Sequence, residues 1–201
     1  MNEFGDLLVV GLGNPGKKYA GTRHNVGADA VNLLAARHDV RLREDNKVSA
    51  AVADVRVGDV HAGDVRVRLA VPLTYMNESG RAVSQLLRRH DLEDPSRLVI
   101  VHDELDLDPG VVKCKAGGGL AGHNGLRDID QHLGWRDFSR VRIGVGKPPG
   151  GARHGANWVL SRVSGAEREV LAESVERAAD ALELIALEGI DPAMARYNAK
   201  T

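Results

Sequence analysis

Short apolar runs alternate along this chain with segments whose apolar residues recur at helical spacing, and this alternation limits the possible folds more than any other feature. Strands are predicted at Leu7–Gly11, Leu98–His102, Val111–Lys115 and Val141–Gly146, and helices at Val26–Arg37, Glu78–His90 and Asn124–Leu133. Apolar–polar alternation over 52–57 and 65–71, with Gly58-Asp59 and Gly63-Asp64 near the turn, adds an antiparallel hairpin. The sequence therefore predicts an α/β fold, a single three-layer α/β/α domain over residues 1–201 with a twisted mixed sheet.

A final long helix is predicted to begin at a capping box, Ser164-Gly165-Ala166-Glu167. Its apolar stripe suits a helix that covers one face of the sheet. The stripe consists of Leu171, Val175, Ala178, Leu182 and Ile185. The segment 147–151, Lys-Pro-Pro-Gly-Gly, is the nearest candidate for a linker, and we interpret it as a surface loop.

Composition excludes several classes of protein. The 201 residues are 43% hydrophobic, enough for a continuous core, and the formal net charge of −1 argues against bulk attraction to nucleic acid while leaving room for a local basic patch. Cys114 is the only cysteine, so neither an internal disulfide nor a multi-cysteine metal cluster can form. Neither a signal sequence nor a membrane span is evident. We expect a cytoplasmic monomer that has no obligate protein partner and does not bind membranes.

The stretch GLGNPG, residues 11–16, satisfies the dinucleotide-binding pattern G-x-G-x-x-G, but its surroundings argue against that function. A dinucleotide site needs a helix that starts within the motif and an acidic residue about 20 positions later. Pro15 lacks an N–H group and Gly21 interrupts the segment again, so the first helical pattern begins only at Val26. A nicotinamide-dependent enzyme is therefore a distant alternative.

Polar residues follow several of the predicted strands, where open α/β sheets bind their ligands. They supply one imidazole, one carboxylate and three primary amides: His24, Asp103, Asn14, Asn77 and Asn124. The sequence contains no G-x-S-x-G, S-x-x-K or H-E-x-x-H motif, so water is the expected nucleophile. A histidine held by a carboxylate can remove a proton from water near neutral pH, and amide N–H groups can stabilise the oxyanion that follows.

Each of these residues also has a purely structural interpretation. A loop histidine such as His24 is more often a surface residue, and Asn14 and Asn77 are typical of turns and helix caps. The acidic run 103–108 can be solvated or bind a cation, although its spacing does not match an EF-hand. Cys114 is interpreted as a buried strand residue. The glycines at 117–119 form either a simple flexible loop or a mobile lid beside a phosphate-binding strip.

Five motifs in this order and spacing closely resemble the bacterial peptidyl-tRNA hydrolase family. They are VGLGNPGKKYAGTRHNVG, VPLTYMNESG, VHDELDLDPG, GGGLAGHNGLRD and RVRIGVGKPPG. The resemblance extends from about Leu7 to Gly146 and continues more weakly through the last helix. Leu120-Ala121 departs from the small or glycine-rich pair usual before GHNG, which leaves the motion of that loop open. The resemblance implies a hydrolase that cleaves the ester between a peptide and the 3′-terminal ribose of tRNA, without cofactor or metal.

The resemblance also implies a role for each site residue. His24 would be the general base, Asp103 would orient it, and Asn14 would sense whether the amino group of the substrate is acylated. Asn77 and Asn124 would position the substrate and the water or oxyanion. The remaining expectations concern binding: Tyr19 and Tyr75 would line the site for the 3′ end and the first peptide unit, and Lys113, Lys115 and Arg142 would contact tRNA phosphates.

The strongest rival hypothesis is a non-catalytic RNA-binding relative of the same fold, such as the plastid splicing factors that resemble this family. RNA binding alone would not require the pair of His24 and Asp103, so the residues favour the enzyme. Aromatic residues make up only 3% of the chain, so we expect recognition of the acceptor stem through backbone and shape rather than through base stacking.

Overall fold

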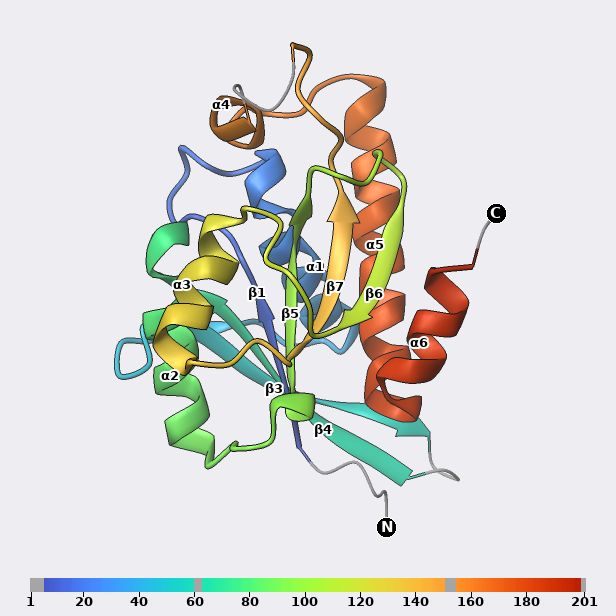
Figure 1. Ribbon diagram of the computed structural model, residues 1–201. Coiled ribbons are helices and arrows are strands. Elements are labelled where there is room, and N and C mark those ends of the chain that lie inside the picture. The colour runs from blue at the N-terminus through green and yellow to red at the C-terminus, as the bar shows by residue number, and fades with distance from the viewer. Residues whose placement is uncertain (1–5, 60–62, 151–154, 200–201) are drawn as a thin grey trace.

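One mixed sheet forms the centre of the molecule. The structure, a computed structural model, describes residues 6–59, 63–150 and 155–199, and within them seven strands lie in the order β2-β3-β4-β1-β5-β7-β6 (Figure 1). The strands are β1 (Leu7–Gly11), β2 (Arg43–Asp45), β3 (Ala50–Asp59), β4 (Gly63–Pro72), β5 (Leu98–Glu104), β6 (Val112–Ala116) and β7 (Ser139–Gly144). Strands β4, β1, β5 and β7 are parallel neighbours, so their carboxyl ends meet at one edge.

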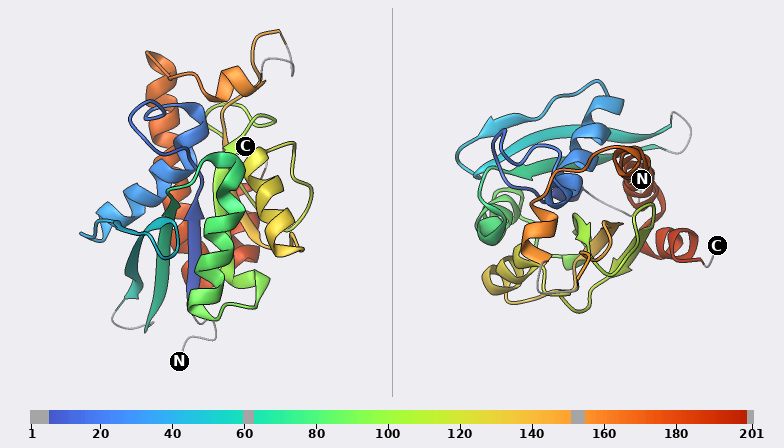
Figure 2. Two further views of the ribbon diagram at one scale, coloured as in Figure 1. Left: turned by 90° about the vertical axis from the view of Figure 1, so that its left-hand side faces the viewer. Right: turned by 90° about the horizontal axis from the view of Figure 1, so that it is seen from above.

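Helices cover both faces of this sheet. They are α1 (Val26–Arg37), α2 (Ser79–His90), α3 (Asn124–Leu133), α4 (Gly155–Val159), α5 (Ala166–Glu188) and α6 (Ile190–Tyr197), with short 3₁₀ turns η1 (Arg23–Asn25), η2 (Met76–Glu78) and η3 (Pro95–Arg97). Helices α1, α5 and α6 lie on one face, and α2 and α3 on the other (Figures 1 and 2). The predicted three-layer α/β/α architecture with a mixed sheet is confirmed.

The central strands are apolar on both sides because both sides are covered. In β1, Leu7 and Val9 belong to the core shared with α1 and α5, whereas Leu8 and Val10 belong to the core shared with α2 and α3. All four side chains are buried. This two-sided burial explains why the strand appears in the sequence as an unbroken apolar run rather than an alternating one.

Two glycines let α1 approach the sheet closely. A Cβ atom on Gly27 would lie 2.2 Å from the carbonyl oxygen of Val101 on β5, and one on Gly11 would lie 2.3 Å from the carbonyl oxygen of Gly27. A side chain at either position would push the helix away. The close contact brings the start of α1, and the turn η1 before it, to the carboxyl ends of β1 and β5.

Several predicted boundaries were wrong. Strand β5 continues two residues further, to Glu104, because the polar residues at its end are buried against partners and not solvated. Strands β3 and β4 include Gly58-Asp59 and Gly63-Asp64, which we had placed near the turn; residues 60–62 lie outside the described part. Strand β7 begins and ends two residues earlier than predicted.

The predicted capping box at the start of α5 was also wrong. The N-cap residue is Gly165, which makes no side-chain cap, and Glu167 is bound instead by Arg23 from η1. We did not predict β2, α4 or α6, which are short and carry weak periodic signals. The 147–150 part of the predicted loop does lie outside regular structure, and Gly151 falls outside the described residues. No helix in the described ranges is long and apolar enough to cross a membrane.

Candidate active site

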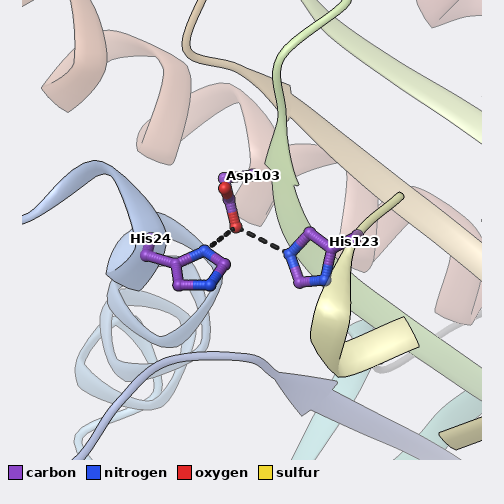
Figure 3. A group of neighbouring side chains, drawn as sticks. All are labelled: His24, Asp103 and His123. Carbon is purple, nitrogen blue, oxygen red and sulfur yellow. Dashed lines mark hydrogen bonds and ion pairs between the residues drawn. The ribbon is translucent and has the colours of Figure 1, made fainter. Parts of the chain in front are cut away.

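A carboxylate between two imidazoles lies at the carboxyl edge of the parallel strands. Asp103 from β5 places its Oδ1 atom 2.8 Å from Nδ1 of His24 in η1 and 2.8 Å from Nε2 of His123 at the start of α3 (Figure 3). The side chains of all three residues are largely buried. The predicted pairing of His24 with Asp103 is therefore present in the structure, and His123 is an addition that we did not predict.

The hydrogen bonds fix how these groups share their protons. Burial alone would raise the pKa of Asp103, but the charges and hydrogen bonds of His123 and His24 outweigh burial and hold it well below its usual range. An ionised carboxylate accepts from both rings, so His24 carries its hydrogen on Nδ1. Among the described residues, none hydrogen-bonds Nε2 of His24, which leaves that nitrogen as a base directed at the cleft.

His123 is fixed in the same way from its other nitrogen. Its Nδ1 atom accepts hydrogen bonds from the backbone N–H groups of Gly125 and Leu126, at 3.2 and 3.3 Å, and so caps α3. The hydrogen of the neutral ring must then be on Nε2, which donates to Asp103. A backbone-held imidazole thus orients the carboxylate that orients His24.

A further buried histidine, His102, supports Asp103 by a hydrogen bond to the main chain of Asp103. His102 is almost inaccessible and its Nδ1 lies 2.8 Å from the backbone oxygen of Asp103, while its ring packs edge-on against His123 with centroids 5.0 Å apart. Burial lowers the pKa of His102 to about 3, with a further contribution from His123. His102 is therefore neutral at physiological pH, and it donates from Nδ1.

Hydrogen bonds hold Asn14 so that its side chain offers a donor. Its side-chain oxygen accepts from the backbone N–H of Met76 at 2.7 Å, and its main chain makes two bonds with the side chain of Asn25, at 2.9 and 3.0 Å. Because the amide oxygen is engaged, the NH₂ group is the free end. Asn25, which we did not predict as a functional residue, thus attaches Asn14 to η1, the turn that contains His24.

The side chains of His24, Asp103 and His123 border a cleft of about 330 Å³ beneath α4. One wall contains His24, Asp103 and the predicted residue Asn124, and the opposite wall is formed by α4. The α4 residues that line it are Gly155, Ala156 and Val159. In Figure 1, α4 lies above the carboxyl edge of the sheet and next to η1.

The other predicted binding residues near this edge lie just outside the cleft lining. Asn77 is exposed in η2, one residue after Met76, and does not cap α2, whose N-cap residue is Glu78. Tyr75 is 54% exposed, and its ring packs edge-on against Tyr19 at a centroid distance of 6.3 Å. Tyr75, which is exposed, and Tyr19, which is half-buried, thus form one aromatic patch next to Met76, which binds Asn14.

The comparisons with known proteins agree with this geometry. A family model described as Peptidyl-tRNA hydrolase matches residues 8–201. The chain belongs to the peptidyl-tRNA hydrolase family. Among curated relatives, the peptidyl-tRNA hydrolase of Leifsonia xyli is 50% identical over 95% of this chain and 96% of its own, and that of Mycolicibacterium vanbaalenii is 48% identical over 96% and 97%.

A solved structure shows the same fold. The crystal structure of peptidyl-tRNA hydrolase from Acinetobacter baumannii superposes with a TM-score of 0.85 at 37% identity, covering 97% of this chain and 95% of that chain. The resemblance inferred from the five motifs is confirmed at the level of family and fold. The pair of His24 and Asp103 fits the catalytic arrangement that we expected for a peptidyl-tRNA hydrolase.

The basic residues expected to bind phosphate lie on a neighbouring part of this peptidyl-tRNA hydrolase fold. The β6–β7 register places Lys113 opposite Arg142 and Lys115 opposite Arg140, so the four cations share one face of the sheet. Arg142 is not free, because its Nε and Nη2 atoms lie 3.1 Å from the buried carboxylate of Glu104. The two lysines, which are half-buried, are the better candidates for phosphate contact.

The glycine-rich loop beside this strip is held in place rather than free. The buried guanidinium of Arg140 donates to the carbonyl oxygens of Gly118 and Gly119, and Gly117 N–H bonds to Phe138 O at 3.1 Å. These contacts favour an ordered loop over the mobile lid that we had left open. Cys114 is buried in β6, as predicted, and burial raises the pKa of its thiol to about 12.

The acidic run and the histidine pair do not combine into an obvious cation site. Glu104 binds Arg142, and Asp106 pairs with Lys147 at 2.9 Å, so these carboxylates point to different partners. Ligand atoms of His24, Asp103 and His123 do lie within 4.8 Å of one another. However, Nε2 of His123 carries a hydrogen because Nδ1 accepts two backbone bonds, so this geometry suits hydrogen bonding rather than metal ligation.

A larger groove of about 500 Å³ lies between α1 and α5. Its wall is mostly apolar, with charged groups from Asp29, Arg162, Arg168 and Glu176, and its described lining contains no imidazole. Of these two, the smaller cleft is the better active-site candidate, because its lining places a buried imidazole in contact with a buried carboxylate.

Proposed function

We propose that this protein hydrolyses the ester bond between a peptide, or another N-blocked aminoacyl group, and the 3′-terminal ribose of tRNA. The observation that carries the proposal is the 2.8 Å contact between Nδ1 of His24 and the ionised Asp103, which leaves Nε2 of His24 as a base in a cleft. Membership of the peptidyl-tRNA hydrolase family supplies the substrate class.

The reaction follows from these groups. Nε2 of His24 takes a proton from water as the water oxygen attacks the ester carbonyl carbon, and Asp103 stabilises the imidazolium that forms. The resulting oxyanion accepts hydrogen bonds from amide N–H groups, for which Asn14, Asn77 and Asn124 are the candidates. The C–O bond to ribose then breaks, and the imidazolium returns its proton to the departing 3′ oxygen. The products are a free carboxyl group and tRNA.

Asn14 provides a physical basis for distinguishing peptidyl-tRNA from aminoacyl-tRNA. Its NH₂ group is free to donate, because Met76 N–H occupies its oxygen. An N-acylated substrate offers a carbonyl oxygen that accepts this hydrogen bond. A free α-ammonium group has only donors and would meet the NH₂ group unfavourably.

Contacts to the tRNA are proposed for two regions of the surface. Tyr19 and Tyr75 form an aromatic patch that suits the 3′ end and the first peptide unit. Lys113 and Lys115, with Arg142 opposite Lys113 on β7, would bind phosphates of the acceptor stem. We propose that the enzyme acts in the cytoplasm as a monomer and without an obligate protein partner.

The decisive experiment measures release of tRNA from N-acetyl-aminoacyl-tRNA in buffer containing EDTA, with unblocked aminoacyl-tRNA as a control. The wild type is expected to cleave only the blocked substrate, and His24→Ala is expected to lose about 10²–10⁴-fold in rate. Loss of wild-type activity in EDTA would overturn the metal-free mechanism. A wild type that binds tRNA without cleaving it would replace the proposal with the RNA-binding alternative.

A further inference from the structure

Two adjacent residues of η1 point in different directions and hold different parts of the molecule. His24 reaches Asp103 on β5, whereas the buried side chain of Arg23 reaches the chain after β7. Arg23 binds both carboxylate oxygens of Glu167 on α5, at 2.6 and 2.7 Å from Nη2 and 3.0 Å from Nε. Its Nη1 atom donates to the hydroxyl of Ser161.

The guanidinium of Arg23 also stacks on α4. Its central carbon lies 3.6 Å from the centre of the Trp158 ring, a distance typical of a planar stack of a guanidinium on an aromatic face. The backbone continues the attachment, because Arg23 N–H bonds to Ser161 O and Thr22 forms a β-bridge with Arg162. The turn that contains the general base is therefore joined to the segment that forms the far wall of the cleft.

Helix α4 depends on such attachments for its position. It spans only five residues, and isolated helices of that length are not stable in water. Trp158 holds α4 in place. Its indole N–H donates to Gly146 O at 3.0 Å and to Val145 O at 3.3 Å, in the segment just after β7, while the ring face lies on Arg23. The neighbouring residues Ala156 and Val159 line the cleft.

We propose that Arg23 is a positioning residue that sets the distance between the base His24 and the substrate-facing wall formed by α4. The inference rests on the proposed function, because it assumes that the reacting ester lies in the cleft beneath α4. Arg23 does not touch the reacting atoms. It holds Trp158 and Glu167, and through them the wall against which the acyl part of the substrate would be placed.

The test compares two arginines that join α1 or its preceding turn to α5. Arg23→Lys keeps the charge but loses the planar fork and the stack. Arg37→Lys is the matched control, because Arg37 ends α1 and binds Glu176 and Asp180 of α5 in a similar way but away from the cleft. Steady-state hydrolysis of N-acetyl-aminoacyl-tRNA by each variant gives kcat and KM separately.

We expect Arg23→Lys to lower kcat/KM by about tenfold, mainly through a higher KM, with an unchanged pH profile because the contact between His24 and Asp103 remains. Arg37→Lys is expected to keep wild-type kinetics. Trp158 provides a readout independent of activity: in a Trp135→Phe background it is the single tryptophan, and its fluorescence should become more accessible to acrylamide in Arg23→Lys.

A second variant covers the case in which the buried arginine cannot be replaced without unfolding. Trp158→Leu removes the stack from the α4 side and leaves the ion pair of Arg23 and Glu167 intact, and it should raise KM in the same way. If Arg23→Lys and Trp158→Leu fold and keep wild-type kcat/KM, the inference is overturned. An inactive wild type would instead overturn the proposed function and this inference with it, so the two failures are distinguishable.

Discussion

The side chain of Asn198 pairs with the main chain of Cys114 as a neighbouring strand would. Its Oδ1 accepts from Cys114 N–H at 3.1 Å, and its Nδ2 donates to Cys114 O at 2.8 Å. Cys114 lies on β6, the last strand of the sheet, whose outer edge would otherwise expose these groups. Asn198 immediately follows α6, so one amide both closes the edge and attaches the last helix.

We expect Asn198→Ala to lower the free energy of unfolding by about 1–3 kcal/mol, because two partly buried backbone groups lose their partners. Urea unfolding followed by far-UV circular dichroism measures the change. Asn46→Ala is the control, since Asn46 is exposed near the start of β3. Equal unfolding midpoints for both variants would contradict a stabilising role for this contact.

The pairing of Asn198 with Cys114 also shows which contacts the sequence could not reveal. The two residues are 84 positions apart, and nothing in the local pattern of either one indicates the other. The same holds for His24 and Asp103, 79 positions apart. Their proximity was predicted only from the rule that parallel strands present their carboxyl ends at one edge, and that rule names an edge, not a hydrogen bond.

Periodicity predicted elements well where burial alone decides the structure. The predicted bounds of helices α1 and α3 and of strand β1 agree with the observed ones. Their apolar residues face a core, and glycine or proline residues lie near their ends, so both the type and the limits of each element can be predicted. The prediction failed at the site. Strand β5 was ended before Asp103, since a buried carboxylate looks like a loop residue until its partners are known.

Glu167 illustrates the same limit. Its spacing from Ser164 matches a capping box, but tertiary contact with Arg23 takes its carboxylate away from the helix end. His123 lies within one of the five motifs, but the sequence gives no sign of its contact with Asp103. The contact arises because His123 is the N-cap residue of α3, which places its ring beside the end of β5. Local patterns therefore specify the layers, whereas ion pairs between distant residues specify the site.

His123 allows a test of the shared carboxylate. Asn is a good N-cap residue, so His123→Asn should keep α3 capped, but its side chain is too short to reach Asp103. Losing a hydrogen bond to a buried charged group costs about 1.5–3 kcal/mol, so we expect the free energy of unfolding to fall by about that amount. Because Asp103 then holds His24 less firmly, we also expect kcat/KM to fall about 10- to 100-fold. His123→Ala should lose both activity and stability. Wild-type kinetics in His123→Asn would show that Asp103 orients His24 unaided.

His102 makes the stability of the protein sensitive to acid. Its folded-state pKa is about 3, below the ordinary value of 6.5, so the unfolded chain binds the proton more readily between these values. The contribution of neutral His102 to the free energy of unfolding is therefore fully present above pH 6.5. It is lost as the pH falls toward 3, at up to about 1.4 kcal/mol per pH unit. The lowered pKa of Asp103 acts in the same direction only below its ordinary value of 3.8.

Urea unfolding between pH 7.5 and pH 4.5 tests this by comparing variants. Asp29, whose pKa burial raises to about 6, and His90, whose pKa burial lowers, also titrate in this window, but they contribute equally to the wild type and to a His102 variant. We expect His102→Gln, which keeps a donor for the main chain of Asp103 but does not titrate, to show a shallower loss of stability than the wild type. His132→Gln changes an exposed histidine on α3 and should leave the slope close to that of the wild type. Parallel slopes for the wild type and His102→Gln would contradict this assignment.

Asn14→Asp should change which substrate is accepted. One carboxylate oxygen can still accept from Met76 N–H, as the amide oxygen does at 2.7 Å, but the free end becomes an acceptor instead of a donor. An acceptor repels the carbonyl of an N-acylated substrate and attracts a free α-ammonium group. We therefore expect kcat/KM for N-acetyl-aminoacyl-tRNA to fall about 10²–10³-fold, with a smaller fall, or a gain, for the unblocked substrate.

The ratio of the two kcat/KM values decides this prediction, because a general loss of activity cancels in it. Asn14→Ala removes both the donor and the oxygen that binds Met76, so it should reduce both activities without reversing the preference. If Asn14→Asp, which still accepts from Met76 N–H, keeps the wild-type ratio, Asn14 acts only by holding Met76 and η2 in place. A shift toward the unblocked substrate in Asn14→Asp alone means that the free end of residue 14 lies close to the α-amino nitrogen of the substrate, because this variant keeps the Met76 contact and replaces only the NH₂ group, by a charged acceptor.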